Sequence, residues 1–146
     1  MEQNRVKKRL NSCNKFTFSI EFQSEVLRFL IQGKESLLYV QKIKPGYFTL
    51  IEHSIVVEAW VKFVKKYQRI PSEVLMVEQV KTLLEGRDYV DLVTKDDIPN
   101  IHKLISELYN KPLKDVDIVL ENIHKFIAYI ELKALNESMD FSDYNS

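Results

Sequence analysis

The sequence predicts an all-α protein, a compact bundle of about six helices with a C-terminal antiparallel helical hairpin. Two observations lead to this class. Only three glycines and four prolines interrupt 146 residues, which leaves long segments without helix breakers. Within those segments the apolar residues recur at helical spacing. A chain of this length is typical of one domain and can bury a sizeable core.

Composition divides the chain into three parts. Residues 1–18 are expected to form a flexible basic arm, because this polar run shows little periodicity. Its first fifteen residues carry five basic side chains against one acidic, a net charge of +4. Residues 19–136 are expected to form the helical domain. Residues 137–146 are rich in small and polar residues, carry a net charge of −3, and are expected to be a linker or tail.

The helical domain is expected to begin with a helix of about residues 20–32, on which the apolar side chains form one broad stripe. Ser19 is a suitable cap for its first turn. Gly33 is expected to end it, because glycine accepts a positive φ at little steric cost. A short second helix is expected at about residues 35–42.

The third helix is expected to span about residues 50–69. It follows a turn at Pro45 and Gly46, and the aromatic pair after that turn is expected to be buried in the domain. Trp60 and two later aromatic residues on this helix repeat at the spacing of a core face. One face does not hold all of its apolar residues, so the helix is expected to lie either at the centre of the domain or at an interface.

Three further helices are expected after Pro71, the fourth ending at about Glu85. The fifth and sixth cover about residues 96–109 and 114–136, and the break at residues 110–112 lets them pair as a hairpin. The sixth helix carries a regular apolar stripe over five turns. The two longest helices carry more apolar surface than one protomer is expected to hide, so they are expected to meet other subunits.

Several kinds of chemistry are absent from the sequence. It contains no glycine-rich nucleotide-binding loop, no GxSxG motif and no HExxH motif. The three histidines fall on separate expected helices. Twenty-one basic residues balance twenty-one acidic ones, so overall charge does not favour a nucleic-acid or membrane partner. No catalytic residue, cofactor or metal is predicted, and the chain alone is not expected to be an enzyme.

The sequence also favours a reducing compartment. Cys13 is the only cysteine, which excludes an internal disulfide. The first twenty residues lack the apolar run of a secretory signal, and no apolar run reaches the length of a transmembrane helix. We therefore expect a cytoplasmic protein, in the host-cell cytoplasm if it is viral, with no membrane partner.

The middle of the chain resembles a known family. An aromatic pair after a turn, a histidine within the next helix and a Lys-Tyr pair before Pro-Ser make up the pattern, carried by Tyr47, Phe48, His53, Ile55, Phe63, Lys66, Tyr67, Pro71 and Ser72. This pattern is similar to that of the N-terminal domain of DnaB-type replicative DNA helicases, especially those of large tailed phages. The resemblance covers about residues 20–136.

The resemblance implies a role in assembly during DNA replication. Such domains form a collar above a ring of ATPase domains, often pair through a helical hairpin, and contact primase or a helicase loader. The chain is then expected to form a homo-oligomer, a dimer or higher, with a hexameric ring in a parent ATP-dependent helicase. It would be a fragment that stops before the motor, or a standalone relative. The residues predicted to carry self-association are Ile123, Phe126, Ile127 and Ile130.

An alternative function stays open at this point. The chain could be a standalone small helical protein that binds nucleic acid or regulates a helicase. Its phosphate contacts would come from the basic face of residues 62–69 and from the arm, through Arg5, Lys7, Lys8 and Arg9. Under the leading interpretation, contact with DNA is weak or indirect.

Overall fold

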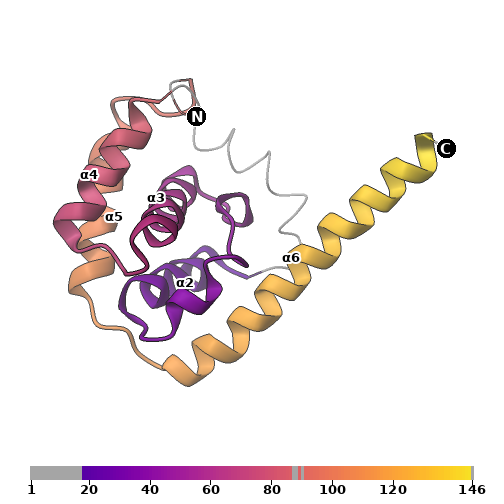
Figure 1. Ribbon diagram of the computed structural model, residues 1–146, viewed down its shortest axis with the longest axis horizontal. Helices are drawn as coiled ribbons and strands as arrows, with labels where there is room; N and C mark the ends of the chain where they lie inside the picture. Colours follow the sequence, from indigo (N-terminus) through magenta and orange to yellow (C-terminus); the bar gives the residue numbers. More distant parts are fainter. Residues whose placement is uncertain (1–17, 87–88, 90, 146) are drawn as a thin grey trace.

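The all-α class is confirmed. The computed structural model describes residues 18–86, 89 and 91–145, with backbone alone for 136–145, and across these residues it contains helices and no strand. Five are α-helices and two are single 3₁₀ turns (Figure 1): α2 Ile20–Gln32, η1 Ser36–Tyr39, η2 Pro45–Tyr47, α3 Ile51–Tyr67, α4 Glu73–Leu84, α5 Asp97–Asn110 and α6 Val116–Asn145. The expected second helix is thus only the turn η1.

Helix α2 begins as the sequence predicts and ends differently. The Ser19 hydroxyl accepts a hydrogen bond from the backbone N–H of Phe22 at 3.1 Å, which satisfies one of the free donors of the first turn. At the other end, Gly33 is extended, with φ −76°, so the expected left-handed cap is wrong. Glycine is needed there for close approach, because a Cβ atom on Gly33 would lie 2.7 Å from the carbonyl oxygen of Phe29.

Helix α3 is central, which decides between the two positions left open for it. Its surplus apolar residues are buried within the protomer, including Val57 and Val64. Trp60 is fully buried and its indole Nε1–H donates to the carbonyl oxygen of Leu30 at 2.9 Å. The predicted core packing is confirmed for Trp60 and Phe63 and is wrong for Tyr67, which is 49% exposed. The expectation that this helix needs another subunit to cover it is wrong, because α2, α4, α5 and η2 already pack on it.

Helices α4 and α5 pack against α3 and against each other. Ser72 caps α4 by accepting from the backbone N–H of Leu75 at 3.3 Å. The phenol of Tyr109 on α5 donates to the carbonyl oxygen of Pro71 at 2.6 Å, which joins the end of α5 to the start of α4. Burial and the nearby Glu73 raise the pKa of Tyr109, so this phenol stays protonated and keeps donating.

The predicted C-terminal hairpin does not form. Helix α5 packs on α2, α3 and α4, whereas α6 packs on the opposite side of α2, which lies between them in Figure 1. The apolar stripe of α6 is covered instead by aromatic residues near the start of α2 and in the η2 turn. The ring of Phe126 lies 5.4 Å from Phe18 and 5.6 Å from Phe48, measured between centroids. The predicted stripe packs from Val119 to Ile130, whereas Val116 and Ala134 at its ends are exposed, and its predicted partner α5 is wrong.

Residues 137–145 of the predicted linker or tail are helical. Helix α6 continues through these residues and projects past the other helices (Figure 1). The small polar residues there are only modestly unfavourable to a helix, and no glycine or proline follows Pro112. In the part of the chain that the structure describes, no helix combines the length and apolarity needed to cross a bilayer.

Candidate docking site

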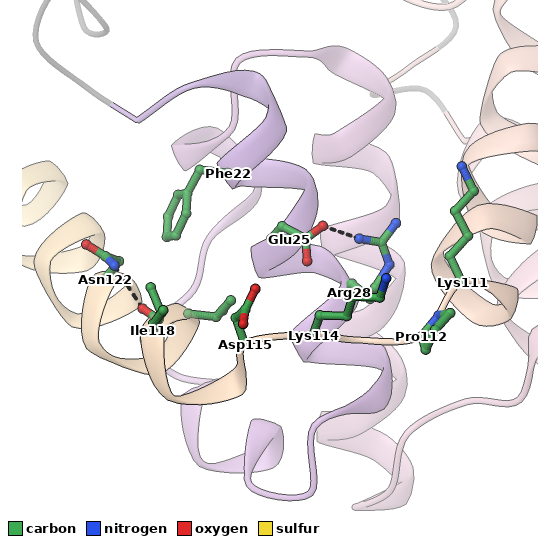
Figure 2. A pocket seen from close by; sticks show the side chains of 10 residues that line it. Phe22, Glu25, Arg28, Lys111, Pro112, Lys114, Asp115, Ile118 and Asn122 are labelled. Carbon is green, nitrogen blue, oxygen red and sulfur yellow. Dashed lines mark hydrogen bonds and ion pairs between the residues drawn. The ribbon is translucent and has the colours of Figure 1, made fainter.

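A hollow of about 690 Å³ lies between α2 and the start of α6. Figure 2 shows Phe22, Glu25 and Arg28 projecting from α2 toward Asp115 and Ile118 at the beginning of α6. The connection between α5 and α6 closes one end, where it contributes Lys111, Pro112 and Lys114.

A half-buried side-chain amide on α2 holds this connection in place. The Nε2 atom of Gln32 donates to the carbonyl oxygens of Leu108 and Lys111, both at 2.7 Å. Its Oε1 atom accepts from the backbone N–H of Leu113 at 2.9 Å. The side chain therefore uses both of its donors and one of its two acceptor lone pairs in hydrogen bonds to three backbone groups. These hydrogen bonds fix the wall of the hollow relative to α2.

The charged groups of this hollow are mixed in sign. Arg28 is only 8% exposed and forms an ion pair with Glu25 through Nη1. Its Nε atom has no hydrogen-bond partner among the described residues. Lys111 contacts Glu107 at 3.9 Å, a long and exposed pair that contributes little. Asp115 adopts a left-handed backbone, with φ 55°, immediately before α6.

The lining of this hollow suits a protein or peptide partner. Phe22 and Val119 supply an apolar floor, and Ile118 is 58% exposed at its rim. Arginine and aromatic side chains beside apolar surface are the composition enriched in protein interfaces. Sequence reasoning did not identify this site, because its residues come from three segments and none belongs to a compact motif.

The residues predicted to carry self-association lie inside the protomer. Ile123, Phe126 and Ile127 are buried and Ile130 is half-buried against the same core. They contact their own α2 and η2 regions, so they do not form a free surface. The predicted phosphate contacts Arg5, Lys7, Lys8 and Arg9 lie outside the described residues.

Other apolar residues of α6 are exposed. Leu132 is 59% exposed and Leu135 is 57% exposed, and both follow Ile130, the last described residue of α6 that packs against the core. The sequence contains a signal for them, because both lie off the core stripe at a spacing of three residues. The sequence analysis did not use that signal, because it considered only the residues of the stripe.

Cations gather at the end of α3. Lys62, Lys65, Lys66 and Arg69 are all exposed. Lys66 Nζ lies 5.3 Å from the ring centroid of Tyr67, and the Arg69 guanidinium lies 5.6 Å from that of Phe63. These residues form a basic surface. The aromatic rings beside it already contact cations of the same segment.

The described histidines have separate environments. His124 Nε2 is 2.9 Å from the hydroxyl of Tyr39. His53 is only 4% exposed, and its Nδ1 atom has no hydrogen-bond partner in the described part of the chain. Burial lowers the pKa of His53 to about 4, so its ring is neutral at physiological pH. The described residues contain no cluster of His, Cys, Asp and Glu that could hold a metal ion.

No protein-family model, curated protein or solved structure matches the chain. The resemblance to helicase N-terminal domains therefore remains a prediction from the residues that carry it.

Proposed function

We propose that this chain is a non-catalytic assembly and docking domain of the kind found at the N-terminus of DnaB-type replicative helicases. In this role it works in the cytoplasm, forms a dimer or higher oligomer within a collar, and contacts a primase or helicase loader. The mixed hollow between α2 and α6 is the surface suited to such a second protein. The proposal assigns the chain no reaction of its own.

The observation that carries this proposal is the exposed end of α6. The helix has 30 residues, and its packed part ends near Ile130. The rest is about half of a rod roughly 45 Å long, at 1.5 Å per residue. Isolated helices of about 12–15 residues are marginally stable in water, so a projecting half-helix gains stability when a partner covers it. Leu132 and Leu135 provide apolar surface for that contact.

The test is the oligomeric state of a variant that carries Leu132→Glu and Leu135→Glu. Glutamate is a good helix former, so α6 is retained and only its apolar surface is lost. Burying one leucine is worth about 1.5–3 kcal/mol. The double change should therefore weaken self-association by about two orders of magnitude or more. Sedimentation equilibrium across micromolar concentrations measures it, with circular dichroism to check the fold.

Leu38→Glu is the matched control, because Leu38 is 74% exposed and lies on η1, whose contact with α6 is at His124, about two turns before Leu132. It should leave self-association unchanged. A wild-type chain that stays monomeric at high micromolar concentration would contradict the proposal. So would equal weakening by the control.

The basic end of α3 favours a second candidate function, contact with nucleic-acid phosphates. The four exposed cations there lie within eight residues of one another, and no described carboxylate lies within ion-pair distance of them. Each phosphate contact adds about 0.7–0.9 to the slope of log affinity against log salt. Lys62→Gln with Lys66→Gln should flatten that slope for single-stranded DNA by up to about 1.4. Lys81→Gln with Lys103→Gln, both exposed elsewhere, should not.

A further inference from the structure

We propose that an acidic groove beside the start of α2 binds the basic N-terminal segment of the same chain, residues 1–15. The groove is a hollow of about 380 Å³, where α2, the start of α3 and α5 meet. Leu50 and Leu104 are among its lining residues. It adjoins the hollow between α2 and α6 and shares Glu25 and Arg28 with it, but it does not involve the exposed end of α6 on which the assembly role rests.

The groove is strongly negative. Four glutamates line it against one arginine, a net charge of −3, since the buried His53 is neutral. They come from all three helices, so the charge comes from the fold and no acidic run in the sequence predicts it: Glu21, Glu25, Glu52 and Glu107. Arg28 offsets Glu25, and the contact of Glu107 with Lys111 is long at 3.9 Å. A concave wall that concentrates one sign of charge favours a cationic occupant.

Two buried polar side chains in the wall support a ligand site independently of that charge. His53 is 4% exposed and Arg28 is 8% exposed, and both line the groove. Each has a buried ring or guanidinium nitrogen without a hydrogen-bond partner among the described residues, Nδ1 of His53 and Nε of Arg28. Unpaired buried polar atoms are costly, and they are rare in native structures except where a further group completes them.

Residues 1–15 suit the groove because of their charge and because they are attached to the chain close to it. Residues 1–15 carry a net charge of +4. They join the body at Phe18, which is anchored by its ring, 4.9 Å from Phe22, and by its carbonyl oxygen, which accepts from Gln23 Nε2 at 3.1 Å. Ile20 and Glu21, at the edge of the groove, are two and three residues further on. A short tether of this kind gives a local concentration in the millimolar range, enough for a weak electrostatic contact to be occupied.

The experiment uses the full chain and its only cysteine. A nitroxide label on Cys13 broadens the NMR signals of amides near it. We expect the backbone amides around Glu52 and Glu107, which are far from Cys13 in sequence, to lose intensity relative to a diamagnetic label. Molar salt should restore that intensity, because it shortens the screening length to about 3 Å.

Charge-neutralising variants test the surface. Glu21→Gln with Glu107→Gln should abolish the broadening. The control is Glu78→Gln with Glu121→Gln, which removes the same charge from exposed sites outside the groove. It is closely matched, because Glu121 contacts Lys125 at 3.9 Å just as Glu107 contacts Lys111. Broadening that persists in the groove variant, or is lost equally in both variants, would overturn the proposal.

A mixed sample tests the connection within one chain. Spin-labelled chain without isotope is mixed with isotope-labelled chain without spin label. Broadening only in the sample in which one chain carries both labels supports the proposal. Equal broadening in the mixed sample assigns the contact to a second copy and refutes it. A monomeric chain that still shows the contact would contradict the assembly role alone, so the two proposals fail separately.

Discussion

Two glutamine side chains on α2 hold the connections of this molecule in place. Gln23 is buried and pairs with both the backbone N–H and the hydroxyl of Thr49, at 2.8 Å and 3.0 Å, which positions the start of α3. Gln32 does the same for the connection to α6. Neither role was predicted, because a glutamine in a helical sequence pattern reads as solvent-facing. Only the backbone groups of distant segments make it a buried partner.

Replacing Gln32 with leucine should be costly. The change leaves the N–H of Leu113 and the carbonyl oxygens of Leu108 and Lys111 without their side-chain partner. None of these three hydrogen bonds is fully buried, and a typical intramolecular hydrogen bond contributes about 0.5–1.5 kcal/mol, so Gln32→Leu should lower the free energy of unfolding by about 1–3 kcal/mol. Urea denaturation measures this. Gln41→Leu, at an exposed position, should change it by less than about 0.5 kcal/mol.

His53 makes stability depend on pH. Its pKa is about 4 in the folded chain, compared with 6.5 when unperturbed, because burial disfavours the charged ring. A folded pKa below the unfolded value means that the contribution is complete above pH 6.5 and is lost as pH falls from 6.5 toward 4. The loss reaches about 2 kcal/mol by pH 5.

The variant His53→Leu isolates this effect. Between pH 7.5 and 5, its free energy of unfolding should fall by about 2 kcal/mol less than that of the wild-type chain, whatever its absolute stability. His102→Leu, at an exposed position, should keep the wild-type pH dependence. Parallel curves for His53→Leu and wild type would show that the ring is not buried in neutral form.

At the scale of the elements, the sequence predicted the helices better than their ends and partners. Apolar periodicity located α3, α4 and α5 to within a few residues, and it identified the packed stripe of α6. It did not reveal which element covers each stripe, because periodicity defines a face and not its neighbour. That is why α6 was paired with α5 when it packs on α2. The end of α3 was missed because Gln68, with φ 59°, ends it in a left-handed conformation without a glycine.

The two glycines near the first connection offer a direct comparison. A Cβ on Gly33 would collide with the buried ring of Phe29 and lie 2.7 Å from its carbonyl oxygen, whereas a Cβ on Gly46 meets nothing within 4 Å. Overpacking of this kind costs about 1–3 kcal/mol. Gly33→Ala should therefore destabilise the chain by that amount. Gly46→Ala should be neutral, or stabilise by up to about 1 kcal/mol through the unfolded state. Thermal or urea unfolding of both variants gives the answer, and an equal cost for the two would refute the close contact at Gly33.

Across the whole molecule, the helices differ in how firmly they are packed against one another. Helices α2 to α5 share a core in which each contacts at least two others, whereas α6 is joined mainly through α2. Helix α6 is anchored by Phe126, which packs among the rings of Phe18, Tyr47 and Phe48. Local stability follows the density of buried contacts, so opening should begin at the free end of α6 and reach α2 and α3 last.

Hydrogen exchange can test both this gradient and the assembly role in one series. In dilute solution, the backbone amides of α3 should exchange only through global unfolding, and those of residues 131–145 should exchange fastest among the helical amides. If the exposed end of α6 is an interface, raising the concentration should slow exchange at residues 131–145, because association stabilises the bound helix in proportion to occupancy. Exchange in α4, which is remote from that end, should not change. The variant Leu132→Glu with Leu135→Glu should remove the concentration dependence and leave the protection of α3 intact. Slow exchange at residues 131–145 that is the same at every concentration would mean that this half-helix is stable alone, and the main physical argument for a partner would be lost.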